Sequence, residues 1–332
     1  WVKAAADKIN KALEVLGDML LNSQFSDEEI EREKGVIIEE LNMYEDNPMM
    51  HIEDVLEICL FGNTPAGWET IGTKKNIKNF KRQDFIDYFN RQYGSNSGQL
   101  VLAGAINSSA LKVSQEILTN LRKNKWMKQI KSVYRQKSPQ VLSIFKDIDQ
   151  VNLSLAVRTF PLNHVEEFNA KLLAIILGGA MSSRLFINLR ERNGLAYYVK
   201  TDVEFYSDAG YLTTQAGVPV NQTARAIKII LDEYKRLKVE LVNKEELKKA
   251  KDLLRGRLLL QMEGSDNLAN WYARQAILRP KIMTPKDFLK KIDKINPRDL
   301  QLTAQKIFID KNLNLALIGR IKSQEVKNIL KF

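Results

Sequence analysis

Apolar and polar residues alternate in the middle of the chain, which is the pattern of half-buried β-strands. The alternation runs through Val141–Phe145 and Val151–Phe160. A third stretch, Thr201–Val218, alternates on both sides of Ser207–Gly210, so it predicts a hairpin that turns at those residues. Together these stretches predict one antiparallel or mixed sheet.

Elsewhere, apolar residues recur every three or four positions, which predicts helices. The expected helices cover residues 1–20, 27–44, 164–179, 222–238, 243–263, 265–278, 284–291 and 297–308. A last apolar stretch, 312–319, predicts a final strand. Strands followed by helices are typical of an α+β fold with the helices packed on one face of the sheet.

Four segments of the first third of the chain recur later in the same order. The residue numbers of each pair differ by 214 to 217. KALEVLGD (11–18) pairs with RAIKIILD (225–232), and FSDEEIEREKGVIIEEL (25–41) pairs with VNKEELKKAKDLLRGRL (242–258). FKRQDFIDYFNRQY (80–93) pairs with INPRDLQLTAQKIF (295–308), and SGQLVLAG (97–104) pairs with NLNLALIG (312–319). A nearly constant offset predicts two homologous α/β-roll domains. We place the first at residues 1–121, a basic connector at 122–137 and the second at 138–332. The first copy has no counterpart of about residues 138–214, so we expect it to be incomplete at its N-terminus.

Composition narrows the classes of function. The net charge of +11 permits a nucleic-acid partner, but lysines and acids alternate as in KKIDKINPRD, so a basic nucleic-acid-binding protein is a remote alternative. One cysteine, Cys59, excludes an intramolecular disulfide and favours a reducing compartment such as the cytoplasm, although the sequence leaves the compartment open. The two histidines, His51 and His164, cannot form a two-histidine metal motif on one helix. No apolar run is long enough to predict a membrane span.

The helix predicted from Asp27 carries two glutamates, Glu33 and Glu40, two turns apart. The apolar stripe of this helix consists of Ile30, Ile37, Leu41 and Tyr44. Both glutamates fall within or beside the stripe, where a carboxylate is costly unless it pairs with a cation or a metal ion. A Lys or Arg from another element is the simpler partner. In the repeat, however, the counterparts are Ala250 and Arg257, so the fold itself does not require the carboxylates.

The segment EREKGVIIEELNMYEDNP resembles the conserved helix of the pitrilysin/insulinase family of inverted zinc metallopeptidases, with the processing-peptidase branch as the nearest match. GWETIGTKKNIKNFKRQDFIDYFNRQYGSNSGQLVLAGAI resembles the next segment of that family. LGGAMSSRLFINLRERNGLAYYV resembles a second-domain stretch in which an Arg and a Tyr are seven residues apart. By motif position, Glu40 matches the third zinc ligand, Glu33 the accessory glutamate, and Arg190 and Tyr197 the Arg and Tyr. HxxEH is absent from this sequence, and the spacing in the family places it before residue 1.

The resemblance implies a zinc-dependent endopeptidase that hydrolyses extended peptides in a chamber between two homologous domains, with Zn²⁺ in the intact protein. It implies Glu40 as a metal ligand, Glu33 as a residue that orients a ligand or water, and Arg190 and Tyr197 as contacts to the substrate or transition state. This chain, without HxxEH, would be inactive as it stands.

Simpler alternatives exist for each of these assignments. Arg190 could form a surface ion pair with Glu191, and Tyr197 could pack in the core beside Tyr198. The whole chain could also be a non-catalytic homologue that acts as a partner or scaffold in a homodimer or heterodimer. The presence of both Glu33 and Glu40 favours the peptidase.

Overall fold

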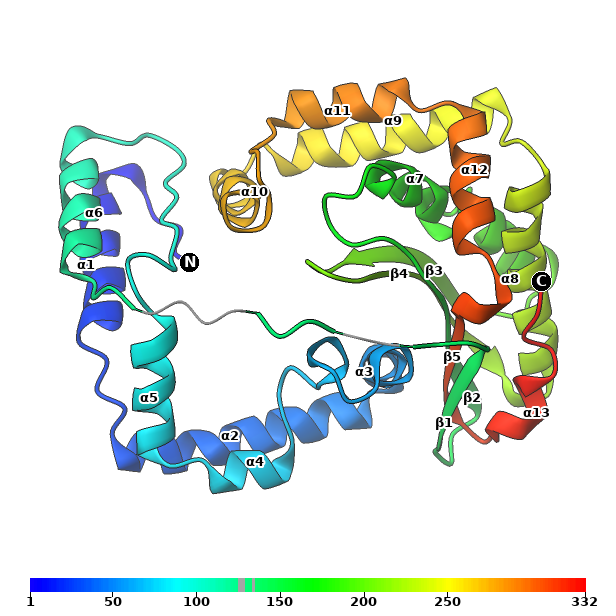
Figure 1. Ribbon diagram of the computed structural model, residues 1–332, viewed down its shortest axis with the longest axis horizontal. Coiled ribbons are helices and arrows are strands. Elements are labelled where there is room, and N and C mark those ends of the chain that lie inside the picture. The colour runs from blue at the N-terminus through cyan, green and yellow to red at the C-terminus, as the bar shows by residue number, and fades with distance from the viewer. Residues whose placement is uncertain (125–128, 133–134) are drawn as a thin grey trace. The chain divides into compact units, whose positions relative to one another are not determined.

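The computed structural model describes residues 1–124, 129–132 and 135–332 (Figure 1). The chain folds into two compact units, each assembled from several stretches of sequence. Unit 1 comprises Trp1–Glu40, Thr73–Gln129 and Arg255–Phe288, and unit 2 comprises Leu41–Gly72, Ile130–Leu254 and Leu289–Phe332. In the predicted connector, residues 125–128 and 133–134 lie outside the described residues. The domain boundaries drawn from the repeat stay a prediction.

Unit 2 is built on a five-stranded mixed sheet in the order β1-β5-β2-β4-β3. The strands are β1 (Gln140–Phe145), β2 (Gln150–Arg158), β3 (Tyr198–Phe205), β4 (Gly210–Pro219) and β5 (Leu313–Gly319). β1 runs parallel to β5, whereas the other neighbours are antiparallel. The α+β class is confirmed, and the expected hairpin is the β3–β4 pair, in which Phe205 lies opposite Gly210.

The sequence predicted helices on one face of the sheet, whereas in the structure helices cover both faces (Figure 1), because α3 (Pro48–Phe61) from the first third of the chain buries its apolar side on the second face. The other helices are α7 (Glu167–Gly178), α8 (Thr223–Val239), α12 (Pro297–Ile307) and the short α13 (Ser323–Lys327). Figure 1 shows α3 on one face of the sheet and α7, α8 and α12 on the other. Apolar residues of α3 share a buried core with Ala316 and Ile318 of β5. On the opposite face, the hydroxyl of Tyr234 on α8 donates to the Oγ1 atom of Thr214 at 2.7 Å.

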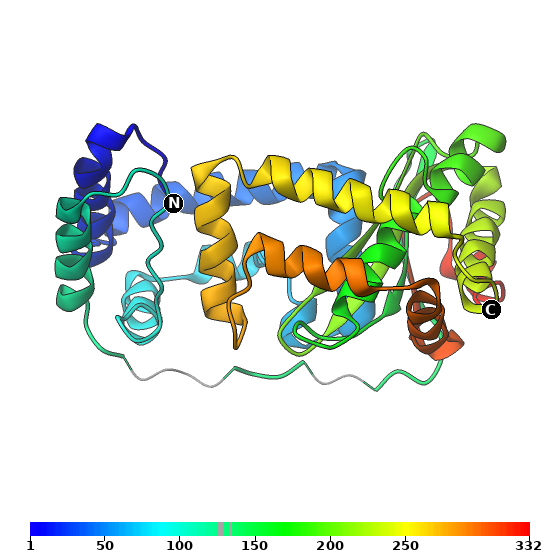
Figure 2. The same cartoon turned by 90° about the horizontal axis from the view of Figure 1, so that it is seen from above.

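Unit 1 contains α1 (Ile9–Leu21), α4 (Lys74–Asn79), α5 (Arg82–Gln92), α6 (Ser108–Asn120) and α10 (Ser265–Leu278). Figure 2 shows α1 and α6 side by side. They pack closely because Gly17 has no side chain; a Cβ there would lie 2.8 Å from the Cγ1 atom of Ile117. None of the described residues of unit 1 forms a strand.

Three helices cross a unit boundary: α2 (Asp27–Asp46), α9 (Lys244–Gln261) and α11 (Pro285–Lys294). The helices expected from the sequence are found, with shifts of a few residues at their ends. The largest difference is at the N-terminus, where the expected helix over residues 1–20 has regular α-helical structure from Ile9. In the described part of the chain, no helix is both long and apolar enough to cross a membrane.

The element bounds repeat at the offsets seen in the sequence. α3 and α10 match at both ends with an offset of 217, and α5 and α12 match at both ends with an offset of 215. The first residues of α1 and α8 match with an offset of 214, and those of α2 and α9 with an offset of 217. In the described residues, only unit 2 contains a sheet, which lies beside α3, α8 and α12.

Candidate substrate-binding site

Arg190 lies on η3 (Phe186–Arg192), a π-helical segment that follows α7 in the chain. π-Helical turns are rare and occur frequently at functional sites. Beyond the segment, the chain reaches Tyr197, whose N–H donates to the carbonyl oxygen of Gly217 at 3.2 Å. Tyr197 is therefore fixed to β4 by its backbone, one residue before β3 begins. β3 is an edge strand of the sheet, so this site lies at a sheet edge.

The guanidinium group of Arg190 lies between two aromatic rings. Its Cζ atom is 5.1 Å from the ring centroid of Phe186 and 5.8 Å from that of Tyr197. Each such cation–π contact at an exposed site contributes about 0.5–1 kcal/mol. The rings hold the cation in place without using its N–H donors. The Arg190 and Tyr197 side chains are thus brought together, as the resemblance implied, although their roles stay predictions.

The simpler alternatives for these two residues are not observed. Within the described residues, Arg190 has no ion pair with Glu191. The Tyr197 side chain is 75% exposed, so it does not belong to the core. The neighbouring Tyr198 is the half-buried one: its hydroxyl donates to Asn152 at 3.0 Å, and burial raises its pKa to about 12. The exposed pair therefore has unused hydrogen-bonding capacity.

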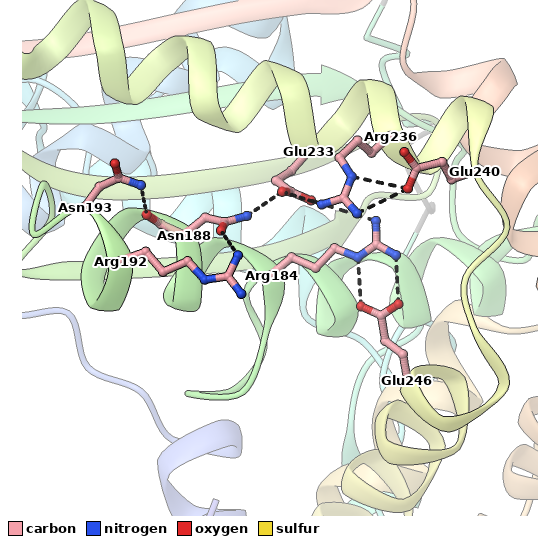
Figure 3. Close-up of polar contacts among 8 residues, drawn as sticks. All are labelled: Arg184, Asn188, Arg192, Asn193, Glu233, Arg236, Glu240 and Glu246. Atoms are coloured by element: carbon pink, nitrogen blue, oxygen red, sulfur yellow. Dashed lines mark hydrogen bonds and ion pairs between the residues drawn. The ribbon is translucent and has the colours of Figure 1, made fainter.

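A network of charged and amide side chains anchors η3 to α8 and α9 (Figure 3). The Nε and Nη2 atoms of Arg184 each donate to Glu246 at 2.7 Å, and its Nη1 atom lies 3.8 Å from Glu233. Asn188, on η3 itself, donates to Glu233 at 2.5 Å, and Arg236 donates to it at 3.0 Å. Glu233 is buried, and such charged hydrogen bonds contribute more than neutral ones. The network fixes the segment that carries Arg190.

Sequence reasoning did not single out this network, although it left a signal. Glu233 lies on α8 between the buried Ile230 and Tyr234, so it is a glutamate at a core position of an apolar stripe. A buried carboxylate needs a cationic or hydrogen-bonding partner. The long-range pairing with Arg184 and Asn188 could not be read from the spacing, because those residues are about 45 positions away in sequence.

Glu33 and Glu40 project from α2, where both are exposed. Ile30 and Leu41 of the expected stripe are buried, so the two glutamates lie beside the stripe, on its solvent side. In the part of the chain that the structure describes, neither glutamate forms an ion pair. The partner from another element that would explain them most simply is therefore not observed. Their assignment to a metal site stays a prediction.

The described residues do not make a zinc site by themselves. Nowhere among residues 1–124, 129–132 and 135–332 do three His, Cys, Asp or Glu side chains come together as a metal would require. The ring of His164 stacks on Phe160 at 4.1 Å, and its Nδ1 atom accepts a hydrogen bond from the N–H of Glu166. Catalytic zinc takes three protein ligands, so Glu40 alone does not fit the ion.

A second polar cluster joins α3 to the sheet of unit 2. The hydroxyls of Tyr206 and Tyr211 both donate to the Oε1 atom of Glu57. One turn earlier, Glu53 accepts from Lys200 at 3.0 Å and from Gln215 at 3.1 Å. Burial raises the pKa of Glu57 above its ordinary value, even though the tyrosine hydrogen bonds favour the carboxylate. This cluster holds α3 in place.

Comparison with known proteins identifies the family to which this chain belongs. Residues 79–254 match the family described as Peptidase M16 inactive domain, and residues 1–74 match Insulinase (Peptidase family M16). The first match alone covers more than half of the 332 residues. The chain belongs to the pitrilysin/insulinase family, M16.

Similar sequences and structures agree with this membership. The Bacillus subtilis uncharacterized zinc protease YmxG is 28% identical over 320 residues, which are 96% of this chain and 77% of that protein. A Rickettsia felis uncharacterized zinc protease is 29% identical over 310 residues, 93% of this chain and 74% of that protein. A Helicobacter pylori protease shares the fold with a TM-score of 0.84 at 19% identity, covering 95% of this chain and 77% of that one. A peptidase M16 inactive domain from Pseudomonas fluorescens shares the fold with a TM-score of 0.85 at 18% identity. The alignment covers 96% of this chain and 77% of that one.

Proposed function

We propose that this chain is the peptide-binding part of a zinc-dependent endopeptidase and that Arg190 and Tyr197 contact the substrate. The observation that carries the proposal is the exposed Arg190 guanidinium, held over Phe186 and Tyr197 at the end of an edge strand. Membership of a family whose relatives are named zinc proteases supports the reaction class. We also propose that the chain belongs to the processing-peptidase branch of this family.

The chemistry of the two side chains suits an extended peptide. Arg190 offers planar N–H donors to a backbone carbonyl or to the oxyanion that forms when the carbonyl is attacked. Tyr197 adds one O–H donor beside it. Extended peptides commonly bind by adding a strand to a sheet edge, and Tyr197 immediately precedes the edge strand β3.

We further propose that this chain contributes one metal ligand, Glu40, with Glu33 orienting a ligand or water beside it. Both side chains are exposed and have no ion pair within the described residues. Because the described residues lack the other ligands, the 332-residue chain is expected neither to bind Zn²⁺ tightly nor to cleave peptides. Zinc analysis and chelator-sensitive cleavage of a fluorogenic peptide by the intact protein test the metal and the reaction.

A non-catalytic role is the second candidate. The match of residues 79–254 to a domain described as inactive favours it. In that case the chain would pair with a second copy or with a family member as a partner subunit. An intact protein that carries no zinc but still binds peptides would support this role over the peptidase.

The peptide site can be tested on this chain directly. The probe is a set of short fluorescent peptides of mixed sequence, and the measurement is fluorescence anisotropy. Arg190→Ala removes hydrogen bonds from a charged donor, so binding is expected to weaken by about 10- to 100-fold. Tyr197→Phe removes one neutral donor and should cost about tenfold or less. Lys228→Ala, at an exposed position of α8, is the control for net charge. Equal affinities of Arg190→Ala and Lys228→Ala would contradict the proposal.

A further inference from the structure

One side chain of η3 joins the turn that carries Arg190 to the neighbouring helix α8. The Nδ2 atom of Asn188 donates to the carboxylate of the buried Glu233 on α8. In the part of the chain that the structure describes, no other side chain of Phe186–Arg192 forms a hydrogen bond or ion pair with a different helix or strand. Asn188 is therefore the direct polar link between η3 and α8.

The other polar atoms of Asn188 also have partners (Figure 3). Its Oδ1 atom accepts from the Nη1 atom of Arg192 at 3.3 Å, and its carbonyl oxygen accepts from the Nδ2 atom of Asn193 at 2.7 Å. The Oδ1 atom of Asn193 accepts in turn from Arg225, near the start of α8, at 2.7 Å. Asn188 thus has a second connection to α8, which passes through Asn193.

These hydrogen bonds reinforce the π-helical turn. In such a turn, a carbonyl oxygen accepts from a group five residues later. The side chain of Asn193 donates to the carbonyl of Asn188 at this spacing. The next two carbonyl oxygens, those of Leu189 and Arg190, accept from backbone N–H groups further along the chain at 2.8 Å and 3.0 Å. Three successive carbonyl groups at the end of η3 are therefore held.

The anchored side of the turn determines where Arg190 lies. Phe186 and Arg190 are four residues apart and in contact, and so are Asn188 and Arg192. Residues two apart on a helical turn do not share a face, so these two pairs lie on different sides of η3. Because Asn188 faces α8, Arg190 is turned away from α8, and its guanidinium group lies beside the ring of Tyr197.

The charged members of the network do not perform this task. Arg184, which binds Glu246, precedes η3, and Arg236 belongs to α8 itself. Neither of them fixes how η3 is rotated about its own axis. Arg236 continues to donate to Glu233 when Asn188 is replaced, so the buried carboxylate keeps a charged partner. A change at Asn188 is therefore expected to free the turn without unfolding the chain.

We infer that Asn188 is a positioning residue for the candidate peptide site. Its bond to Glu233 fixes the rotation of η3 and thereby holds the guanidinium group of Arg190 beside Tyr197. The inference rests on the proposed function in one respect, which is that Arg190 contacts the peptide. A side chain that is already ordered loses less conformational entropy on binding, so the anchored turn favours affinity. Asn188 itself makes no contact with the peptide.

Nuclear magnetic resonance of the 332-residue chain with labelled arginine tests the positioning without any peptide. The Nε–H resonance of Arg190 is identified by its loss in Arg190→Ala. Ring currents of Phe186 and Tyr197 displace this resonance from the usual arginine position, because the guanidinium group lies close to both rings. Asn188→Ala should move the resonance toward the usual position. A substitution that only lowers stability leaves the resonance of the folded chain where it was.

Asn169→Ala is the matched control for lost stability. Asn169 is partly buried on α7, and its Nδ2 atom donates to Thr303 of α12 at 2.9 Å, so it too joins two elements through an amide. Both variants should lower the melting temperature. Only Asn188→Ala should move the Arg190 resonance. Equal displacement in the two variants, or none in Asn188→Ala, would contradict the inference.

An exchange of donor and acceptor then tests the bond itself. Asn188→Asp keeps an acceptor for Arg192 but replaces the donor to Glu233 with a second carboxylate, so it should displace the Arg190 resonance as Asn188→Ala does. Addition of Glu233→Gln supplies the donor from the other side at unchanged net charge, and the resonance should return. Circular dichroism checks that the double variant is folded. A folded double variant without this recovery would show that the bond does not position Arg190.

Peptide affinity provides the functional test, with the labelled peptides used for Arg190→Ala. Asn188→Ala should weaken binding by about three- to tenfold in the unaltered chain. In a chain that already carries Arg190→Ala it should cost less than about twofold, because its effect passes through Arg190. Equal losses in both backgrounds would overturn the inference. If Arg190→Ala alone leaves affinity unchanged, the proposed function fails, and the resonance of Arg190 still decides whether Asn188 positions it.

Discussion

The two units contain matching helices but differ in what those helices cover. In unit 2, α8 and α12 pack on one face of a five-stranded sheet whose other face is covered by α3 (Figure 1). In unit 1 the matching sides of α1 and α10 line an open groove. The local sequence is therefore enough to set where the matching helices begin, while the sheet decides whether their apolar faces are buried.

The largest expected effect comes from the strand and its counterpart. Leu317→Ala in β5 removes a side chain that is fully buried and should lower the free energy of unfolding by about 2–5 kcal/mol. Leu102→Ala, at the matching position of unit 1, should cost less than about 1 kcal/mol because the groove is open. Urea unfolding followed by circular dichroism measures both. Equal losses would mean that residues 99–103 are packed as β5 is.

The next effect concerns the network that exists only in the second copy. Glu233→Ala removes the acceptor of Asn188 and Arg236 inside the protein, so it should destabilise the fold by about 1–3 kcal/mol. Its counterpart at an offset of 214 is Met19, an exposed residue of α1, and Met19→Ala should cost less than about 0.5 kcal/mol. Thermal unfolding compares them. A loss for Met19→Ala as large as that for Glu233→Ala would contradict the comparison.

A smaller effect depends on pH. Burial raises the pKa of Glu57 above 4.5, so just above pH 4.5 the folded chain holds a proton that the unfolded chain has released. Stability therefore falls as the pH rises through that window, and Glu57→Gln should make this slope shallower. Asp54 and Glu69 are shifted in the same direction, so some slope remains.

The control for this pH effect is Arg274, the counterpart of Glu57 on α10. Arg274 is exposed and carries no carboxylate, so Arg274→Gln should leave the slope unchanged. The measurement is the urea midpoint from pH 4.5 to about pH 8, a range that starts at the ordinary pKa of Glu57. A slope that is equally steep in Glu57→Gln and in the unaltered chain would contradict the assignment to this carboxyl.

The smallest expected effect is that of the two exposed glutamates. Glu33→Ala and Glu40→Ala break no ion pair in the described chain, so each should change stability by less than about 0.5 kcal/mol. Their counterparts in the repeat, Ala250 and Arg257, already show that the helix forms without carboxylates. Loss of zinc by the intact protein, with the melting temperature of the metal-free form unchanged, would support their proposed role. A large drop in the melting temperature of the metal-free form would instead indicate a structural role.

Local patterns predicted most elements of this fold. The turn of the β3–β4 hairpin follows from the alternation that ends at Gly210, and the ends of α10 follow from apolar spacing between Gly264 and Pro280. The repeat also holds in the structure, where α3 and α10 have the same length at an offset of 217. These features depend on neighbours in sequence, which the pattern records.

Long-range features could not be predicted in the same way. The apolar spacing of residues 48–61 does not say which sheet α3 covers, and in the structure it packs on strands that lie far beyond it in the sequence. The π-helical turn that presents Arg190 was not expected either, because its stabilising partners, Glu233 and Glu246, are distant in sequence. The resemblance to the family predicted that Arg190 and Tyr197 belong to the candidate site. The stacking of Arg190 on Phe186 could be seen only in the structure.

Hydrogen exchange of the 332-residue chain tests most directly whether the two copies differ as described. Amide exchange reports local opening, and unpaired amides exchange far faster than those of a central strand. Amides of Leu100–Ala103 should exchange at close to unprotected rates, whereas those of Leu315–Ile318 in β5 should be among the most protected of the chain. Equal protection of the two segments would contradict the account, since it would mean that the first copy already has its strand partners.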